Sequence, residues 1–419
     1  MNRRSRCLLL IGSSLVLVSA ALAAAVAGSV TDTSSGLALA QAHEHEPHGS
    51  DEHAPSTPAQ QRSPEHQQRI LQTEQSTREG QQQQPMMMPH TPMPEMPGLM
   101  GMEHGSEAAE MGGHDMSPVD VSDAPAAGPD ARGGQLLLPT MRDGVKEFEL
   151  TTGIVRWKIL PDVEVGAYAY NGQVPGPMIR MEPNDRVRMR VRNELPEATT
   201  VHWHGFILPI EQDGVPEISQ PPIPPGGEHV YEFDVPDTPG TYFYHTHFSA
   251  DRQQPLGLYG ALIIDEPEQP PDVASEHIIA LGEWTVVAGE TYPAMQLADM
   301  LPNYFTFNGK SYPATETLNV KVGGRILVRL IGSGQFIHPI HIHGGPFEIT
   351  ATDGNPVPVA ARLTKDTVLV GPGERYDVVW TARSPGKWLL HCHINHHVTN
   401  DGAEVDGGGG MTMIIDVSS

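Results

Sequence analysis

The residues best suited to do chemistry lie near the C-terminus, in the stretch HCHINHHVTNDGAEVDGGGGM from His391 to Met411. Thiolate sulfur and imidazole nitrogen are the ligands that proteins offer to soft or borderline metal ions such as copper. The chain has two cysteines, and one of them, Cys7, lies in an N-terminal segment typical of an export signal. Cys392 then has no partner for a disulfide in an oxidising compartment, so a bound metal is the role that the pattern favours.

Pairs of histidines separated by one residue recur along the chain, and ten of the 13 histidines after residue 135 fall into four clusters. In a β-strand, residues i and i+2 point to the same face, so each H-x-H pair presents two imidazoles together. Cys392 and His338 stand at odd offsets from these pairs and point to the opposite face, where a second metal site could form. The clustered histidines are His202 and His204, His245 and His247, His338, His341 and His343, and His391, His393 and His397.

That second site has the composition of a blue-copper electron-transfer centre, which takes one cysteine thiolate, two histidines and a weak axial methionine. Cys392, His397 and Met411 supply three of these ligands, and His338 would come from another strand. Because Cys392 is bonded through the backbone to the histidines on either side of it, few covalent bonds would separate this site from the histidine cluster.

Short runs rich in β-branched and aromatic residues must position these ligands. They begin at about residue 136, are bounded by Pro, Gly, Asn and Asp, and include RVRMRVRNEL, GTYFYHTHF and GKWLLHCHI. With no long helical pattern among them, they predict an all-β fold of sandwich or barrel type. The length suits two domains, 136–267 and 268–419. Each half carries two H-x-H pairs and a similar closing strand, which indicates a duplication.

The first 135 residues differ in composition. Residues 1–28 join three arginines to an apolar run ending in small residues, the pattern of an export signal, and an uncleaved run is about long enough to anchor the chain in a membrane. Residues 29–135 lack apolar periodicity and predict a disordered tail. This tail holds eight of the 21 histidines and nine of the 18 methionines, which are copper-type ligands. We expect an exported protein, periplasmic or extracellular.

The charge balance excludes some partners. The formal net charge is -25, with 51 acidic against 26 basic residues. Such a surface repels nucleic acid and gives no reason for adhesion to anionic membranes. We therefore expect no nucleic-acid partner, and no membrane contact beyond a possible uncleaved N-terminal anchor.

Together the motifs resemble those of the multicopper oxidases, the laccase-like blue-copper oxidases of cupredoxin fold. The resemblance runs from about residue 145 to the C-terminus, includes VHWHG and LGLYGALII, and contains all four family copper motifs in order. It implies two tandem cupredoxin-like Greek-key β-sandwich domains and about four copper ions per chain. The implied activity is one-electron oxidation of a small-molecule or metal-ion reductant at a type 1 copper, coupled to four-electron reduction of O2 to water at a trinuclear cluster.

The resemblance also implies a role for each ligand. Met411 is preferred over Met413 as the axial ligand, because Met411 follows glycine at the start of the last strand, as in the family. Asp213, in EQDGVP, matches an acidic residue of the family and is the candidate proton relay, although a role as a turn former before glycine suits it equally. The type 1 copper would be held by His338, Cys392, His397 and Met411, the type 2 copper by His202 and His341, and the type 3 pair by His204, His245, His247, His343, His391 and His393.

Two features depart from the usual family pattern. The family commonly has three cupredoxin domains, whereas this chain has room for two, and only the second carries HCH where the first has HTH. In two-domain relatives the trinuclear cluster lies between neighbouring subunits of a ring of three, so the resemblance implies a homotrimer. The 398–410 loop before Met411 is also longer than usual. We expect Thr399 to Asp406 to form an acidic flap beside the type 1 copper, with Glu404 and Asp406 as weaker proton-relay candidates.

Three other interpretations stay open. The reductant could be a phenol or a metal ion such as Cu(I) or Mn(II), and the tail rich in methionine and histidine favours the metal ion. A copper-containing nitrite reductase shares the two-domain trimeric plan, but it needs a type 1 cysteine in the first domain. A copper-storage or copper-resistance protein would bind copper without consuming oxygen.

Overall fold

The computed structural model describes residues 115–128, 130–266, 272–296, 301–405 and 407–419. All of them belong to one compact unit, residues 101–419. The expected signal at 1–28 and the expected tail up to residue 114 lie outside the described residues. The last part of that expected tail is packed, because Val119 is buried in the core of the first domain and its amide donates to the Thr291 carbonyl at 2.9 Å. The first domain therefore begins before residue 136.

The all-β prediction is confirmed, and alternation along the strands explains it. In β6 (Arg186–Asn193), Val187, Met189 and Val191 are buried, while the arginines between them face outward. One such arginine, Arg188, bonds Glu232 on the neighbouring strand at 3.0 Å. A strand with this period buries one face and solvates the other, which is the pattern of a sandwich.

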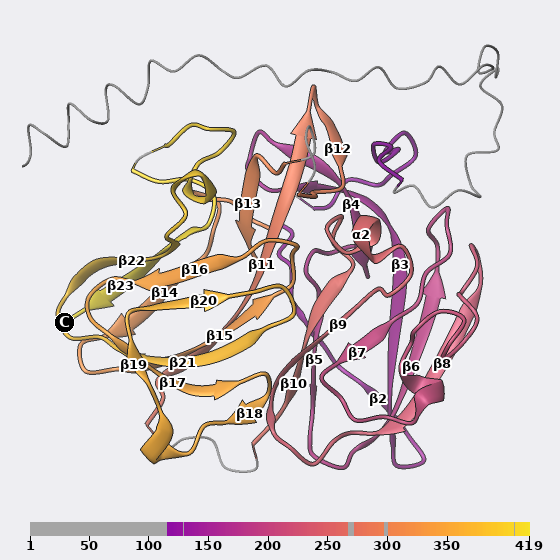
Figure 1. The fold of residues 1–419 in the computed structure, drawn as a ribbon, viewed down its shortest axis with the longest axis horizontal. Helices are drawn as coiled ribbons and strands as arrows, with labels where there is room; N and C mark the ends of the chain where they lie inside the picture. The colour runs from indigo at the N-terminus through magenta and orange to yellow at the C-terminus, as the bar shows by residue number, and fades with distance from the viewer. Residues whose placement is uncertain (1–114, 129, 267–271, 297–300, 406) are drawn as a thin grey trace, which may run out of the picture. The chain divides into compact units, whose positions relative to one another are not determined.

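The first domain consists of two five-stranded sheets, with orders β1-β5-β10-β9-β7 and β2-β3-β6-β8, the latter extended by β4 on β3 (Figure 1). Their faces enclose a core built around Trp203, Tyr231 and Tyr244. The remaining bounds are β1 Leu136–Leu137, β2 Thr140–Arg142, β3 Val145–Lys158, β4 Glu164–Tyr170, β5 Gly176–Met181, β7 His202–His204, β8 Glu228–Asp234, β9 Gly240–His245 and β10 Tyr259–Ile264, with η1 Ile210–Gln212 and α2 Ala250–Gln253.

The second domain pairs an eight-stranded sheet with a five-stranded one. The first has the order β12-β11-β15-β21-β17-β18, with β13 on β11 and β19 on β17, and the second has the order β14-β23-β22-β16-β20. The bounds are β11 Ser275–Val287, β12 Glu290–Tyr292, β13 Tyr304–Phe307, β14 Thr317–Lys321, β15 Arg325–Gly332, β16 His338–Ile342, β17 Phe347–Thr352, β18 Asn355–Pro356, β19 Thr364–Lys365, β20 Thr367–Val370, β21 Arg375–Thr381, β22 Gly386–Cys392 and β23 Thr412–Ser418, with η2 Val359–Ala361 and η3 Asn395–Val398.

Each domain places its two H-x-H pairs on adjacent antiparallel strands. In the first domain His202 of β7 is in register with His245 of β9. In the second, His341 of β16 is in register with His391 of β22. This repeated arrangement agrees with the duplication that the sequence indicates.

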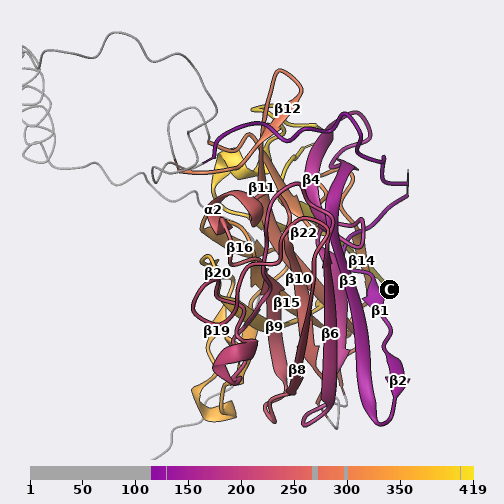
Figure 2. The ribbon, with the colours of Figure 1, turned by 90° about the vertical axis from the view of Figure 1, so that its right-hand side faces the viewer.

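The two domains share buried contacts. Trp157 of β3 packs in one cluster with Trp284 of β11, and its indole nitrogen donates to the Gly309 carbonyl at 2.7 Å. A second contact is made by hydrogen bonds to Thr241 of the first domain. Its hydroxyl accepts from Arg329 of β15 at 2.9 Å and donates to the Asp377 carboxylate at 2.6 Å. Figure 2 shows β3 and β11 from the side.

Among the described residues, none of the helices has the length and apolar character that crossing a bilayer requires.

Candidate metal centre

The cysteine site is assembled from β16, β22 and η3. The Cys392 sulfur lies 3.8 Å from His338 Nδ1 and 3.5 Å from His397 Nδ1, and the two Nδ1 atoms lie 3.2 Å apart. Metal–nitrogen bonds of about 2.0 Å and metal–sulfur bonds of about 2.3 Å at trigonal angles would hold such donors about 3–4 Å apart. The three side chains are buried and form one of the groups able to hold a metal. The donor set therefore fits a copper ion.

The electrostatics of this site also suit a metal. Burial, with a smaller contribution from Glu283, raises the pKa of the Cys392 thiol to about 12, so the free thiol stays protonated. A coordinated cation reverses this, because it holds the sulfur as thiolate. Burial, together with His338 and His396, lowers the pKa of His397 to about 3. Its imidazole is therefore neutral, with a lone pair free for a metal.

Met411 is held against both neighbouring ligand residues. Its amide donates to the His397 carbonyl at 2.9 Å, and its carbonyl accepts from the Cys392 amide at 3.1 Å. The side chain is fully buried. Met413 instead lies in register with Leu390, further along β22. The backbone of Met411 is therefore held beside Cys392 and His397, and its axial role stays a prediction.

The long loop reaches Met411 through a passage that only glycine permits. Gly410 has φ +46, and a Cβ there would lie 2.1 Å from the His397 carbonyl oxygen. Asn400, which is 9% exposed, accepts from the Gly410 amide at 2.9 Å and donates to the Tyr312 carbonyl at 2.8 Å. The part of the expected flap next to the copper site is therefore tied down. Glu404 is exposed further out, and Asp406 lies outside the described residues.

One residue of this site was missed from the sequence. Glu283 of β11 has a fully buried side chain, and its Oε1 lies 2.5 Å from His338 Nε2. A carboxylate on the far nitrogen fixes the tautomer and the orientation of a ligand imidazole. The available signal was the acid in HIIALGEWTV, a run that is otherwise almost wholly apolar.

The first domain gathers its own imidazoles. His202, His204 and His245 form a second group with donor atoms within 4.8 Å of one another, and the His247 ring lies 5.6 Å from that of His202. The His204 Nδ1 faces His245 Nε2 at 3.2 Å. Burial, then Arg375 and the neighbouring imidazoles, lowers the pKa of His204 to about 4, so this ring is also neutral. We call these four histidines the domain 1 half-set.

The second domain gathers four more histidines. His341, His343 and His391 form the third group, and the His393 ring lies 5.6 Å from that of His341. His343 Nε2 faces His391 Nε2 at 3.0 Å. We call these four the domain 2 half-set. In the part of the chain that the structure describes, every ring contact among these eight histidines lies within one half-set.

Backbone carbonyls orient the two proposed type 2 ligands in the same way. His202 Nδ1 lies 2.7 Å from the Asp213 carbonyl oxygen, and His341 Nδ1 lies 2.7 Å from that of Asp366. Each ring therefore directs Nε2 outward. The Asp213 carboxylate lies 3.5 Å from the His202 ring, close enough for the relay role expected of it. Asp366 holds the matching position in domain 2, and duplication of the halves was the signal that could have found it.

Thr246 lies between His245 and His247 in the first domain, as Cys392 lies between His391 and His393 in the second. It is buried and donates to the Gln253 side chain at 2.7 Å. The first domain thus has no thiol at this position, as the HTH motif predicts. His396, the neighbour of His397 in the chain, is exposed, and its ring centroid lies 4.3 Å from that of His397.

Comparisons with known proteins agree with this geometry. Two family models described as multicopper oxidase match residues 153–269 and 287–403. The chain is 34% identical over 250 residues to the multicopper oxidase MmcO of Mycobacterium tuberculosis, covering 52% of this chain and 48% of that one. It is 48% identical over 140 residues to copper resistance protein A of Pseudomonas syringae pv. tomato, covering 33% and 22%.

Two solved structures are similar across both domains. Multicopper oxidase mgLAC gives a TM-score of 0.61 at 34% identity, and the blue copper oxidase from Nitrosomonas europaea gives 0.58 at 33%. Each match covers 65% of this chain and 86% of the other. The chain spans less than half the length of the two curated relatives above.

Proposed function

Because the chain belongs to the multicopper oxidase family, we propose that it oxidises a reductant one electron at a time at a type 1 site and reduces O2 to water at a trinuclear site. The observation that carries this proposal is the buried triad His338, Cys392 and His397, whose cysteine lies between two members of the domain 2 half-set. Copper, when bound, supplies the one-electron chemistry and the reduction of O2.

The chain's own residues have distinct tasks in this scheme. Glu283 orients His338, and the loop tied by Asn400 sets Met411. The peptide bonds from Cys392 to His391 and His393 link the two sites covalently. Asp213, beside His202, delivers protons that O2 reduction consumes. Burial lowers the pKa of His204 and His245 in the domain 1 half-set and of His343 and His391 in the domain 2 half-set, so these imidazoles keep their lone pairs for metal.

We propose a homotrimer in which the domain 1 half-set of one subunit meets the domain 2 half-set of its neighbour. The separation of the half-sets within one chain supports this arrangement, since each half-set alone offers four of the eight imidazoles. A head-to-tail contact that closes after three copies repeats the same site three times.

A complementation experiment tests this assembly. His204→Gln inactivates the domain 1 half-set, and His393→Gln inactivates the domain 2 half-set, so neither variant alone should consume oxygen. In trimers refolded from an equal mixture, about a quarter of the sites would join two intact half-sets and recover activity. His229→Gln, outside the clusters, is the control and should match the unmodified protein. A mixture as inactive as its components would refute the shared site.

The reductant is either a small phenol-type molecule or a metal ion such as Cu(I) or Mn(II). The second is favoured by the methionine- and histidine-rich segment 29–135 and by the similarity to a copper resistance protein. If the segment delivers copper, its deletion should slow oxidation of Cu(I) and leave that of a substituted phenol unchanged. Equal loss of both rates would rule out delivery.

Two alternatives make different predictions. A nitrite reductase of this plan would need a thiol where the first domain has Thr246, which disfavours it. A copper-storage protein would show about four coppers per chain and a blue colour but no oxygen uptake with any reductant. Oxygen uptake by the copper-loaded chain with hydroquinone separates the oxidase from storage. We further propose export to the periplasm or the extracellular space, where copper-handling relatives would act.

A further inference from the structure

The ligands of the type 1 site are closed off from solvent. His338, Cys392 and Met411 are 0% exposed, and His397 is 3% exposed. The outer nitrogen of His338 faces the buried Glu283 carboxylate, and the His397 ring is stacked on Phe305 with centroids 4.0 Å apart. A reductant as large as an aromatic ring therefore has no ligand edge to dock on, and its electron must cross intervening protein.

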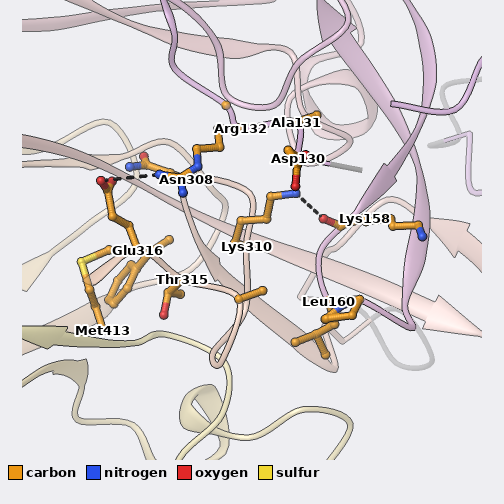
Figure 3. Close-up of a pocket in the computed structure, with 14 residues that line it drawn as sticks. Asp130, Ala131, Arg132, Lys158, Leu160, Asn308, Lys310, Thr315, Glu316 and Met413 are labelled. Atoms are coloured by element: carbon orange, nitrogen blue, oxygen red, sulfur yellow. Dashed lines mark hydrogen bonds and ion pairs between the residues drawn. The ribbon is translucent and has the colours of Figure 1, made fainter. Parts of the chain in front are cut away.

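A cavity of about 440 Å³ lies between segments of the two domains, close to this site (Figure 3). We call it the seam cavity. Its size is that of a pocket for one small organic molecule. One wall comes from the first domain, from residues 130–133, Lys158, Leu160 and Pro161. The opposite wall comes from the second domain, from Phe307, Asn308, Lys310, residues 314–316 and Met413.

The second wall is bonded to the backbone on both sides of Met411. The Thr315 hydroxyl, which lines the cavity, donates to the Thr412 carbonyl at 2.8 Å. The Tyr312 amide in the same segment donates to the Gly410 carbonyl at 2.9 Å. Since the Met411 carbonyl accepts from the Cys392 amide, a short chain of bonds joins the cavity wall to the cysteine. The cavity is thus placed to pass an electron to the type 1 site.

The ammonium group of Lys310 is a cation available to a molecule bound in the cavity. The Lys310 ammonium lies 4.2 Å from the centre of the buried Trp157 ring and donates to the Lys158 carbonyl at 2.6 Å. Burial and the nearby charges of Arg132 and Lys158 lower the pKa of Lys310 to about 8. A bound anion would relieve this repulsion. Asp130 and Glu316 also line the cavity, so three cations face two carboxylates there. Arg132 pairs with Glu316 at 3.7 Å, which leaves Lys158 and Lys310 as the cations for a ligand, beside the single carboxylate of Asp130. Leu160 and Phe307 supply apolar surface for a ring.

We propose that the seam cavity binds a small aromatic reductant carrying a carboxylate, and that this molecule gives its electron to the type 1 site through the 312–315 segment. The proposal rests on the proposed oxidase function. Each phenol loses one electron to the protein and its hydroxyl proton to solvent, leaving a phenoxyl radical. Four such steps supply the electrons that, with O2 and four protons, form two waters.

Direct binding tests the cavity without turnover. The probe is 3,4,5-trimethoxybenzoate, which has no phenolic proton to lose, titrated into the copper-loaded full chain by calorimetry. Lys310→Gln should weaken binding about tenfold, the effect of losing one charge-assisted hydrogen bond. Lys310→Arg should keep most of the affinity, and Lys321→Gln, which removes an exposed lysine elsewhere, should keep all of it. For the unmodified chain, affinity should fall as pH rises above about 8, where Lys310 loses its proton.

Turnover tests the electron path. Syringate and its methyl ester have the same phenol and differ in the carboxylate. Lys310→Gln should raise KM about tenfold for syringate and less than twofold for the ester. Ala314→Trp, which fills the cavity, should raise KM for both, with the blue absorption unchanged.

The outcomes separate the two proposals. Unchanged syringate KM in both Lys310→Gln and Ala314→Trp would overturn the seam cavity as the reductant site while leaving the oxidase intact. Failure of trimethoxybenzoate to bind would overturn it as well. Absence of oxygen uptake with hydroquinone, which is small and uncharged, would instead overturn the oxidase function. The calorimetry would then still show whether the seam cavity binds an aromatic carboxylate.

Discussion

Replacing Asn400 by alanine tests how the chain sets the axial methionine. The Asn400 side chain accepts from the Gly410 amide at 2.9 Å and donates to the Tyr312 carbonyl at 2.8 Å, and it is 9% exposed. Alanine removes both bonds and leaves two largely buried backbone groups without these partners. Each such loss costs about 1–2 kcal/mol, so the free energy of unfolding should fall by about 2–4 kcal/mol.

The stability loss alone would be a structural effect, so the informative measurement is spectroscopic. Gly410 precedes Met411 directly, and a released Gly410 lets the axial ligand move. The potential and spectrum of a type 1 copper depend on that ligand. We expect Asn400→Ala to change the blue absorption bands, the spin-resonance hyperfine splitting and the reduction potential of the copper-loaded protein. Asn400→Asp, which keeps the acceptor for Gly410 and loses the donor to Tyr312, should show a smaller spectral change.

The matched control is Asn355→Ala, which removes an exposed side chain bonded at 3.0 Å to the nearby Asp353 carbonyl. It should alter neither the spectrum nor the stability beyond about 0.5 kcal/mol. If Asn400→Ala lowers stability as expected but leaves the spectrum and potential unchanged, Asn400 does not position Met411 and the reasoning fails.

Three further outcomes follow from the site. Glu283→Gln should raise the type 1 reduction potential, because a negative charge beside His338 is removed, and should weaken copper retention about 10–100-fold. The control Glu404→Gln, at an exposed position, should change neither property. Redox titration measures the potential, and competition with a chelator measures copper retention. The metal-free protein should lose stability as pH falls from about 6.5 toward 4. His204, His245 and His397 have pKa values of about 4, 3 and 3 in the folded chain, so over this pH range the unfolded chain binds protons that the folded chain does not bind. Urea unfolding at pH 7.5 and pH 5 checks the sign, and greater stability at pH 5 would contradict it. Cys392→Ser should abolish the blue absorption but keep the signal of the type 2 copper, and loss of both signals would show that the two sites are not independent in assembly.

Much of this protein was determined by local sequence. Period-two alternation in stretches such as RVRMRVRN specifies half-buried strands, because a strand places every second side chain on one face. The same rule puts the members of each H-x-H pair together and turns Cys392 away from its flanking histidines. Strand periodicity therefore predicted the all-β fold, and ligand identity and spacing predicted the copper-type donor set and the H-x-H pairs.

Other features were decided by the tertiary structure. Glu283 reaches His338 only because β11 and β16 belong to facing sheets of one sandwich, a contact between residues 55 positions apart. Composition predicts an acidic flap for the 398–410 loop. The path of the loop, however, depends on the hydrogen bonds of Asn400 and on the absence of a side chain at Gly410, next to His397. Burial of all four type 1 ligands, and the cavity that lies along the bonded wall, arise from packing between distant strands. Periodicity determines on which face of a strand each side chain lies, but only the packing of the sheets determines which residues that side chain contacts.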